Sequence, residues 1–327
     1  MRPCVLVVST GLLVLAGCSG PQSALEPAGR GAERIADLFW WMTVGAVVIW
    51  LAVIALALYA ERVRPEAHSR RQANALIIGG GAIIPTVVLA GLLVYGLALT
   101  PDLLAPAPEG SLKIAVTGEQ WWWRVRYLPP GGGSVELANE IRLPVGDHVE
   151  FRLESPDVIH SFWIPSLGGK LDMIPGRLTR LTLEPTRTGV FRGACAEYCG
   201  TSHALMSFAV VVLDKADFAA WLERQQQPAQ APAEPLADRG RELFLANGCG
   251  ACHAVRGTSA DGVVGPDLTH VGSRLSLGAG ILPNEPDGFF RWIARTEEVK
   301  PGVHMPAFGM LPAEDLQALA VYLDGLQ

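Results

Sequence analysis

The pattern of apolar and polar residues changes from one region to the next along this chain of 327 residues. Two long runs, residues 39–60 and 73–100, are predominantly apolar and contain no charged side chain. A helix of about 22 residues rises roughly 33 Å, which is enough to cross the hydrocarbon core of a membrane. The pattern therefore predicts a transmembrane helix hairpin over residues 39–100, with a kink at Pro85 in the second helix.

Charged residues flank the two apolar runs unequally. The connection over residues 61–71 contains four arginines, whereas residues 101–110 contain acids and prolines but no Lys or Arg. Basic loops stay on the cytoplasmic side. The hairpin connection is therefore predicted to be cytoplasmic, and both ends of this two-pass chain are predicted on the periplasmic side of a bacterial plasma membrane.

The amino terminus carries a candidate export signal. Arg2 precedes an apolar run that is too short to span a bilayer, and Leu-Ala-Gly stands directly before Cys18. This pattern indicates a lipoprotein signal peptide over residues 1–17, after which Cys18 becomes the lipid-modified amino terminus. An ordinary signal peptide cut nearby is the alternative. The polar residues 18–38 are then a periplasmic segment.

Residues 111–214 change to short runs with a period of two, separated by Pro and Gly turns such as residues 129–133. Such strands at regular spacing predict an antiparallel sandwich or barrel, and we expect an all-β, cupredoxin-like Greek-key barrel. The alternating runs are residues 112–116, 121–127, 148–153, 178–183 and 208–213.

Composition narrows the function class. Half of the residues are hydrophobic, 18% are charged, and the net charge is -6, which argues against a nucleic-acid partner. The six cysteines form three close pairs at positions 4 and 18, 195 and 199, and 249 and 252. None remains for a structural disulfide framework, so the cysteines are expected to do chemistry.

The central cysteine pair belongs to a cluster of soft ligands. Cys195, Cys199, His203 and Met206 lie within one short stretch, with His160 upstream. Thiolate, imidazole and thioether suit copper, and a second thiolate allows two sulfur atoms to bridge a pair of copper ions. A disulfide or a four-ligand zinc site is the alternative. A disulfide leaves the histidines and methionine without a role, and zinc rarely binds a thioether.

A third region follows residues 225–235, whose Pro, Ala and Gln composition indicates a semi-extended linker. Residues 236–327 begin with a predicted helix that leads into Cys249-Gly-Ala-Cys252-His253, the attachment sequence of c-type haem. The thiols form thioethers to the porphyrin, and His253 becomes the proximal iron ligand. A thioredoxin-like site or a zinc knuckle is the alternative, but neither requires this histidine, a leading helix and an export signal together.

The same region is predicted to be an all-α cytochrome c domain. Residues 312–323 begin with a proline and two acids and continue with helical spacing, which predicts a terminal helix. From residue 236 onward, 11 acidic residues stand against 7 basic ones. A basic electron donor could therefore dock on this domain.

Ordered motifs give the chain a family resemblance. It resembles subunit II of haem-copper cytochrome c oxidases, and because a cytochrome c domain follows the copper domain, it resembles the caa3 type over nearly everything after residue 35. The motifs that carry the resemblance are Gln-Trp-Trp-Trp at residues 120–123, Asn-Glu-Ile-Arg-Leu-Pro-Val-Gly at 139–146, Ser-Pro-Asp-Val-Ile-His-Ser-Phe-Trp-Ile-Pro at 155–165, Gly-Lys-Leu-Asp-Met-Ile-Pro-Gly-Arg at 169–177, and the stretch to Met206.

The resemblance implies site residues. In this family the binuclear centre is called Cu-A, and the implied ligands are His160, Cys195, Cys199, His203, Met206 and the backbone carbonyl of Glu197. The carboxylate of Glu197 is implied in a magnesium site at the boundary with subunit I, and Trp121 is the implied point of electron entry.

The resemblance also bears on the sixth haem ligand and on the other two tryptophans of residues 121–123. Met305 resembles the sixth haem ligand in the methionine-proline loop of small cytochromes c, with Met310 and His304 as alternatives. Trp122 and Trp123 are expected to serve packing.

The implied function is serial electron transfer. A donor such as a cytochrome c or cytochrome bc1 complex reduces the haem, Cu-A accepts the electron, and subunit I, accompanied by subunit III, reduces oxygen and translocates protons. This chain alone carries no candidate for the oxygen-reducing site. The alternatives are an electron-delivery subunit of a Cu-A-containing nitric oxide reductase, or a non-redox structural subunit, which the complete ligand set disfavours.

Overall fold

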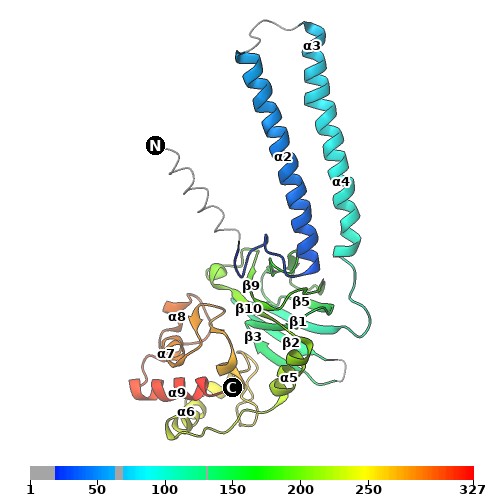
Figure 1. Cartoon of the computed structure of the whole chain (residues 1–327). Coiled ribbons are helices and arrows are strands. Elements are labelled where there is room, and N and C mark those ends of the chain that lie inside the picture. The colour runs from blue at the N-terminus through cyan, green and yellow to red at the C-terminus, as the bar shows by residue number, and fades with distance from the viewer. Residues whose placement is uncertain (1–18, 63–68, 130–131) are drawn as a thin grey trace, which may run out of the picture. The chain divides into compact units, whose positions relative to one another are not determined.

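The computed structural model describes residues 19–62, 69–129 and 132–327 (Figure 1). The predicted signal peptide, Cys18 and the connection over residues 63–68 lie outside the described residues. The chain forms two compact units. One is Arg34–Ala105, and the other contains the residues up to Glu33 together with Pro106–Gln327.

The smaller unit contains the apolar helices. Helix α2 spans Arg30–Arg62, and the second run forms α3 (Arg70–Asn74), the π-helical segment η1 (Ala75–Ile83) and α4 (Ile84–Leu103). Both helical stretches are long and apolar enough to cross a membrane, judged by length and composition. The winding changes directly before Pro85, the second residue of α4, where the sequence predicts a kink. Arg34 forms an ion pair with Asp102 near the opposite ends of the two stretches.

The larger unit begins with a β-sandwich of two five-stranded sheets. One sheet has the order β3-β2-β1-β5-β8 and the other β4-β10-β9-β6-β7. The alternating runs of the sequence all form strands. The strands are β1 (Leu112–Glu119), β2 (Trp122–Leu128), β3 (Val135–Ala138), β4 (Glu140–Pro144), β5 (Val149–Glu154), β6 (His160–Trp163), β7 (Leu171–Met173), β8 (Thr179–Leu183), β9 (Gly189–Cys195) and β10 (Ser207–Leu213).

The sheets differ from the expected antiparallel barrel in two places. Strand β1 pairs with β5 in parallel, and β4 pairs with β10 in parallel, while the other pairs in the sandwich are antiparallel. Parallel neighbours need a long crossover connection. The chain provides one each time by passing into the opposite sheet, because β4 lies between β1 and β5 in sequence but belongs to the other sheet.

Aromatic side chains fill the space between the sheets. Trp123, Phe162 and Phe208 are fully buried or nearly so, and the rings of Phe162 and Phe208 stack with centroids 5.0 Å apart. The Trp123 ring lies edge-on to Phe208 at 5.1 Å. This cluster holds β2, β6 and β10 together, and β6 and β10 border the candidate metal ligands.

Helix α5 (Lys215–Gln226) covers the sandwich and leads toward the C-terminal domain. Its Trp221 packs edge-on against Tyr127 with centroids 5.3 Å apart. The irregular segment that follows is shorter than the predicted linker, since α5 ends at Gln226 and α6 begins at Pro235. Main-chain bonding between Ala229 and Arg256 ties this segment to the C-terminal domain.

The C-terminal domain is helical, as predicted. It contains α6 (Pro235–Ala246), α7 (Pro286–Ala294), α8 (Thr296–Val299) and α9 (Ala313–Asp324), with 3-10 turns η3 (Cys249–Ala251) and η4 (Val271–Ser273) and a two-residue ladder of β11 (Ser276–Leu277) with β12 (Leu282–Pro283). Helices α6 and α9 cross at Gly240, where a β-carbon would lie 2.0 Å from the carbonyl oxygen of Ala318. The glycine allows the backbones to touch.

The Gly240→Ala variant should therefore destabilise the C-terminal domain, by about 1–3 kcal/mol, which is typical of overpacking. Hydrogen exchange of peptides from α6 and α9 measures this change. Arg241→Ala is the control, because it removes a half-exposed ion pair with Asp238 on α6 and leaves the glycine at the crossing. Equal hydrogen exchange in the two variants would contradict the close contact of α6 and α9 at Gly240.

Candidate metal centre and haem-attachment site

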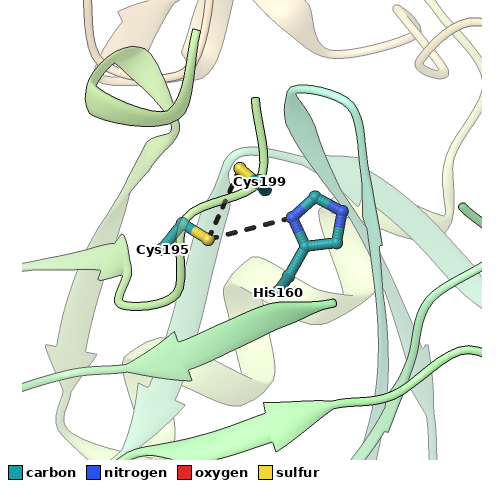
Figure 2. Close-up of side chains that lie close together, drawn as sticks. All are labelled: His160, Cys195 and Cys199. Atoms are coloured by element: carbon teal, nitrogen blue, oxygen red, sulfur yellow. Dashed lines mark hydrogen bonds between the residues drawn. The ribbon is translucent and has the colours of Figure 1, made fainter. Parts of the chain in front are cut away.

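Three of the predicted copper ligands, His160, Cys195 and Cys199, lie close together between the ends of strands (Figure 2). The sulfur atoms of Cys195 and Cys199 lie 3.8 Å apart, too far for a disulfide, and both cysteines are free. His160 Nδ1 lies 3.8 Å from Cys195 Sγ, and His203 Nδ1 lies 3.5 Å from Cys199 Sγ. Met206 Sδ completes the group at 3.8 Å from Cys199 Sγ.

Strand pairing explains this meeting of distant residues. Strand β6 begins at His160 and pairs with β9, which ends at Cys195. The loop from Cys195 to Met206 is closed by a hydrogen bond from the Cys195 amide to the Met206 carbonyl at 3.0 Å. Within this loop the carbonyl oxygen of Glu197 lies 3.1 Å from Cys195 Sγ, as its predicted ligand role requires. The short loop from Cys195 to Met206 thus holds five of the six predicted ligands beside the sixth, His160, at the start of β6.

The two thiols of this cluster differ in acidity. The hydrogen bond between the two sulfur atoms is the main reason why the pKa of Cys195 lies well below its usual range. The same bond, together with burial, raises the pKa of Cys199. Cysteine binds a metal ion as the thiolate, so metal binding at this pair is coupled to the release of protons.

Asp157 supports the cluster, a role that the sequence did not reveal. Its carboxylate accepts a hydrogen bond from His160 Nε2 at 2.9 Å and one from the Gln120 amide at 2.7 Å. Burial opposes a charge on His160, but the bonds to Cys195 and Asp157 raise the pKa of His160 overall. With Nε2 held by Asp157, Nδ1 faces the sulfur atoms, which is the usual arrangement of a metal-binding histidine. The one feature of the sequence that could have indicated this role is the position of Asp157, three residues before His160.

Trp121 touches the metal-ligand loop directly. Its indole Nε1 donates to the carbonyl oxygen of Cys199 at 2.9 Å, and the neighbouring Gln120 side chain donates to the same oxygen at 2.7 Å. The other two tryptophans behave as the sequence predicts. Trp123 is in the core, and Trp122 lies beneath the guanidinium of Arg124, 4.7 Å from the ring centroid.

The carboxylate of Glu197 points away from the cluster. It is half-exposed, and its oxygen lies 3.8 Å from Lys170 Nζ. A group that must reach a metal at a subunit boundary needs such exposure, and the predicted magnesium role of Glu197 stays a prediction.

The second predicted site lies at the end of α6. Cys249 is half-buried in η3, Cys252 is exposed, and both are free thiols. His253 Nδ1 donates to the carbonyl oxygen of Pro266 at 2.8 Å, which leaves Nε2 available for iron. Gly265 fits against this ring, because a β-carbon there would lie 2.5 Å from His253 Cε1. Burial lowers the pKa of His253, so the imidazole stays neutral, as a ligand must.

A buried arginine supports the presence of an anionic group in this domain. The Nε atom of Arg274 is buried and has no hydrogen-bond partner among the described residues. Its charge is close enough to His253 to lower the pKa of that histidine. Its guanidinium also donates to the carbonyl oxygen of Asp267 and lies near the carboxylates of Asp267 and Glu140, so a haem propionate would be a further acceptor, for Nε. The residues present therefore fit a c-type haem.

The candidate sixth ligands lie in the loop between α8 and α9. Met305 is half-buried, His304 is exposed, and Met310 is 77% exposed. Met305, the first choice from the sequence, is thus more buried than Met310, the alternative.

Fold and sites together define a class: a cupredoxin joined to a c-type cytochrome domain, on a chain with candidate membrane helices. The sequence profile described as "Cytochrome C oxidase subunit II, periplasmic domain" matches residues 130–213, and the profile "Cytochrome c" matches residues 237–327.

Relatives resemble the chain over nearly its full length. A protein of Alkalihalophilus pseudofirmus named "Cytochrome c oxidase subunit 2" is 36% identical, covering 96% of this chain and 94% of that protein. One of the same name from Bacillus subtilis is 30% identical, covering 99% of this chain and 97% of that protein. This chain belongs to the family of cytochrome c oxidase subunit II. Membership implies a Cu-A centre, association with a membrane and subunit I as partner, and the cytochrome c domain implies a haem c.

Among solved structures, the periplasmic domain of subunit II of cytochrome oxidase from Bradyrhizobium japonicum is 34% identical to the matched part. The match covers 37% of this chain and 97% of that domain, with a TM-score of 0.35.

The Asp157→Ala variant tests the support of His160. Without the carboxylate, His160 Nε2 loses its acceptor, and copper affinity should fall about 10- to 100-fold, as for other partners of metal ligands. Competition with a copper chelator measures the change. Asp172→Ala, on β7, is the matched control, since its carboxylate takes no part in the bond to His160. If both variants retain copper equally, Asp157 does not support the site.

Proposed function

We propose that this chain is subunit II of a proton-pumping haem-copper terminal oxidase. It takes electrons from a donor at a covalent haem c and passes them through a binuclear Cu-A centre to the haem of subunit I, where oxygen is reduced to water. The observation that carries the proposal is the single cluster formed by Cys195, Cys199, His160, His203 and Met206, with the Trp121 indole bonded to the same loop.

The cluster suits a copper pair for a chemical reason. Two thiolates can bridge two ions, while one imidazole on each side and a thioether complete a soft donor set. Zinc in a four-ligand site would leave Met206 without a role, although Met206 is buried and in contact with Cys199. Bound at these residues, the copper pair and the haem each supply one-electron oxidation and reduction.

Rigidity is what this chain's own residues contribute. His160 is oriented by Asp157, and the Cys199 carbonyl is held by Gln120 and Trp121. Ligands that keep their positions in both oxidation states lower the reorganisation that accompanies electron transfer. We propose that Cys249, Cys252, His253 and Met305 would hold the haem, the two cysteines through thioethers.

The surroundings of the sites complete the assignment. The two apolar helices anchor the chain in the membrane, with the copper and haem domains assigned to the periplasmic face and Cys18 to lipid attachment. Glu197 is exposed, as a magnesium ligand shared with subunit I requires. Subunit III completes the complex, and the acidic C-terminal domain suits a basic donor such as a cytochrome c.

Purification of the complex from membranes tests this function. We expect two copper ions and one covalent haem on this polypeptide, and oxygen consumption with the natural donor. A Cys199→Ser variant should lose copper and turnover while keeping its covalent haem. Nitric oxide consumption in place of oxygen consumption would assign the chain to a nitric oxide reductase, and full copper content in Cys199→Ser would refute the centre.

A pair of methionine variants tests the sixth haem ligand. Met305→Leu should abolish the absorption band of methionine-ligated ferric haem and lower the reduction potential, since a thioether stabilises ferrous iron. Met310→Leu is the matched control and should leave both unchanged. A loss of the band in Met310→Leu alone would transfer the assignment to Met310.

A further inference from the structure

The C-terminal domain and the β-sandwich contact each other at Trp121. Both belong to the same compact unit. The indole of Trp121 donates to Cys199 on one side, while its opposite edge faces Gly302, where a β-carbon would lie 2.9 Å from Cη2 and Cζ3. Trp121 is only 8% exposed as a result. Its ring therefore spans from the metal-ligand loop to a loop of the other domain.

Lys300 is buried at this contact. It is 2% exposed, and its Nζ donates to the carbonyl oxygen of Trp121 at 2.6 Å and to that of Gly278 at 2.9 Å. The first acceptor belongs to the sandwich and the second to the C-terminal domain. One amine thus joins the main chains of two domains. A buried lysine is costly unless its hydrogen bonds are satisfied, so this side chain has a structural task.

This link does not depend on the charge of the amine. Burial lowers the pKa of Lys300 to about 7. The ammonium form and the neutral amine both carry the N–H groups that two carbonyl acceptors require.

Further hydrogen bonds connect the two domains. Each donor and acceptor belongs to a different domain, and at least one of the two is a main-chain atom. They run from Ser202 Oγ to Pro301 O at 2.6 Å, from Ser207 Oγ to Ala279 O at 2.8 Å, from the Leu275 amide to Glu140 Oε2 at 2.7 Å, and from Arg124 Nη2 to Val263 O at 3.1 Å. Main-chain groups paired in this way fix one register of docking.

We infer that Lys300 clamps the C-terminal domain onto the β-sandwich as a permanently docked partner, so that Trp121 is covered and reserved for the haem of this same chain. The inference deepens the proposed function and rests on it, because it states which partner occupies the electron-entry surface. An external donor then has its docking surface on the C-terminal domain.

The position of the clamp within the loop gives it significance for electron transfer. Lys300 and Gly302 precede Met305, the proposed haem ligand, by five and three residues. Three residues of extended chain span at most about 11 Å. The clamp therefore limits the distance between the haem-ligand loop and Trp121, and Lys300 acts as a positioning residue that touches neither metal.

The Lys300→Met variant tests the clamp in the intact complex. Methionine fills a similar volume but cannot donate, so the carbonyls of Trp121 and Gly278 lose their donor. We expect hydroxyl-radical oxidation of Trp121 to become tenfold faster or more, and electron passage from haem to copper, followed by stopped-flow absorbance, to slow at least tenfold. Reduction of the haem by the donor should stay unchanged.

Matched variants separate the possible outcomes. Lys215→Met, which removes an exposed lysine from α5, should behave as the unaltered chain in both measurements. Ser202→Ala removes one neighbouring bond and should shift both in the same direction by less. Copper and haem content, measured on every variant, identifies misfolding. If Lys300→Met loses copper or haem, the smaller shift expected for Ser202→Ala tests the clamp in its place.

Two results have distinct meanings. If Trp121 is oxidised and electrons pass from haem to copper at the same rates in Lys300→Met, Ser202→Ala and the unaltered chain, the clamp is wrong while the proposed function stands. If the unaltered chain passes no electron from haem to copper, the proposed function is wrong, and the labelling of Trp121 still reports whether the domains are docked.

Discussion

The carbonyl oxygen of Cys199 is the acceptor on which the electron-transfer architecture depends. It receives one hydrogen bond from the Trp121 indole and another from the Gln120 side chain. The main-chain amide of Gln120 in turn donates to Asp157, which also orients His160. The loop that contains Cys199 and the strand that begins at His160 are thereby connected through residues 120 and 121 and Asp157. A metal site of this kind is rigid before metal binds, which favours fast electron exchange.

The sandwich supplies the stiffness behind these bonds. Strands β6, β9 and β10 lie together in one sheet, and aromatic rings between the sheets prevent them from shifting. The parallel pairings of β1 with β5 and of β4 with β10 place sequence-distant strands side by side. The loops at the ends of these strands can then carry metal ligands while the strands keep the loops in place.

The C-terminal domain extends the same principle across a domain boundary. Its contact with the sandwich uses main-chain carbonyls and amides, which have fixed positions once each domain is folded. The segment between α5 and α6 is itself hydrogen-bonded to this domain through Arg256. A fused partner held in one register replaces diffusional encounter with a fixed geometry.

Local sequence carried much of the chemistry. The Cys-x-x-Cys-His motif, the soft donors from Cys195 to Met206 and the two apolar runs each act through residues close in sequence, so spacing alone predicted haem attachment, a copper site and two helices. Strands with clear alternation were predicted as well. Short strands such as β7, which has three residues, carry too little periodic signal to be recognised.

Long-range contacts were decided only by the tertiary structure. Asp157 and Lys300 look like ordinary polar residues in sequence, and their roles appear when His160 and Trp121 are placed beside them. The parallel strand pairs and the covering of Trp121 likewise join residues far apart in the chain. Sequence determines which groups are present and what they bind locally, whereas burial and hydrogen bonding between distant segments follow from the packing of the whole fold.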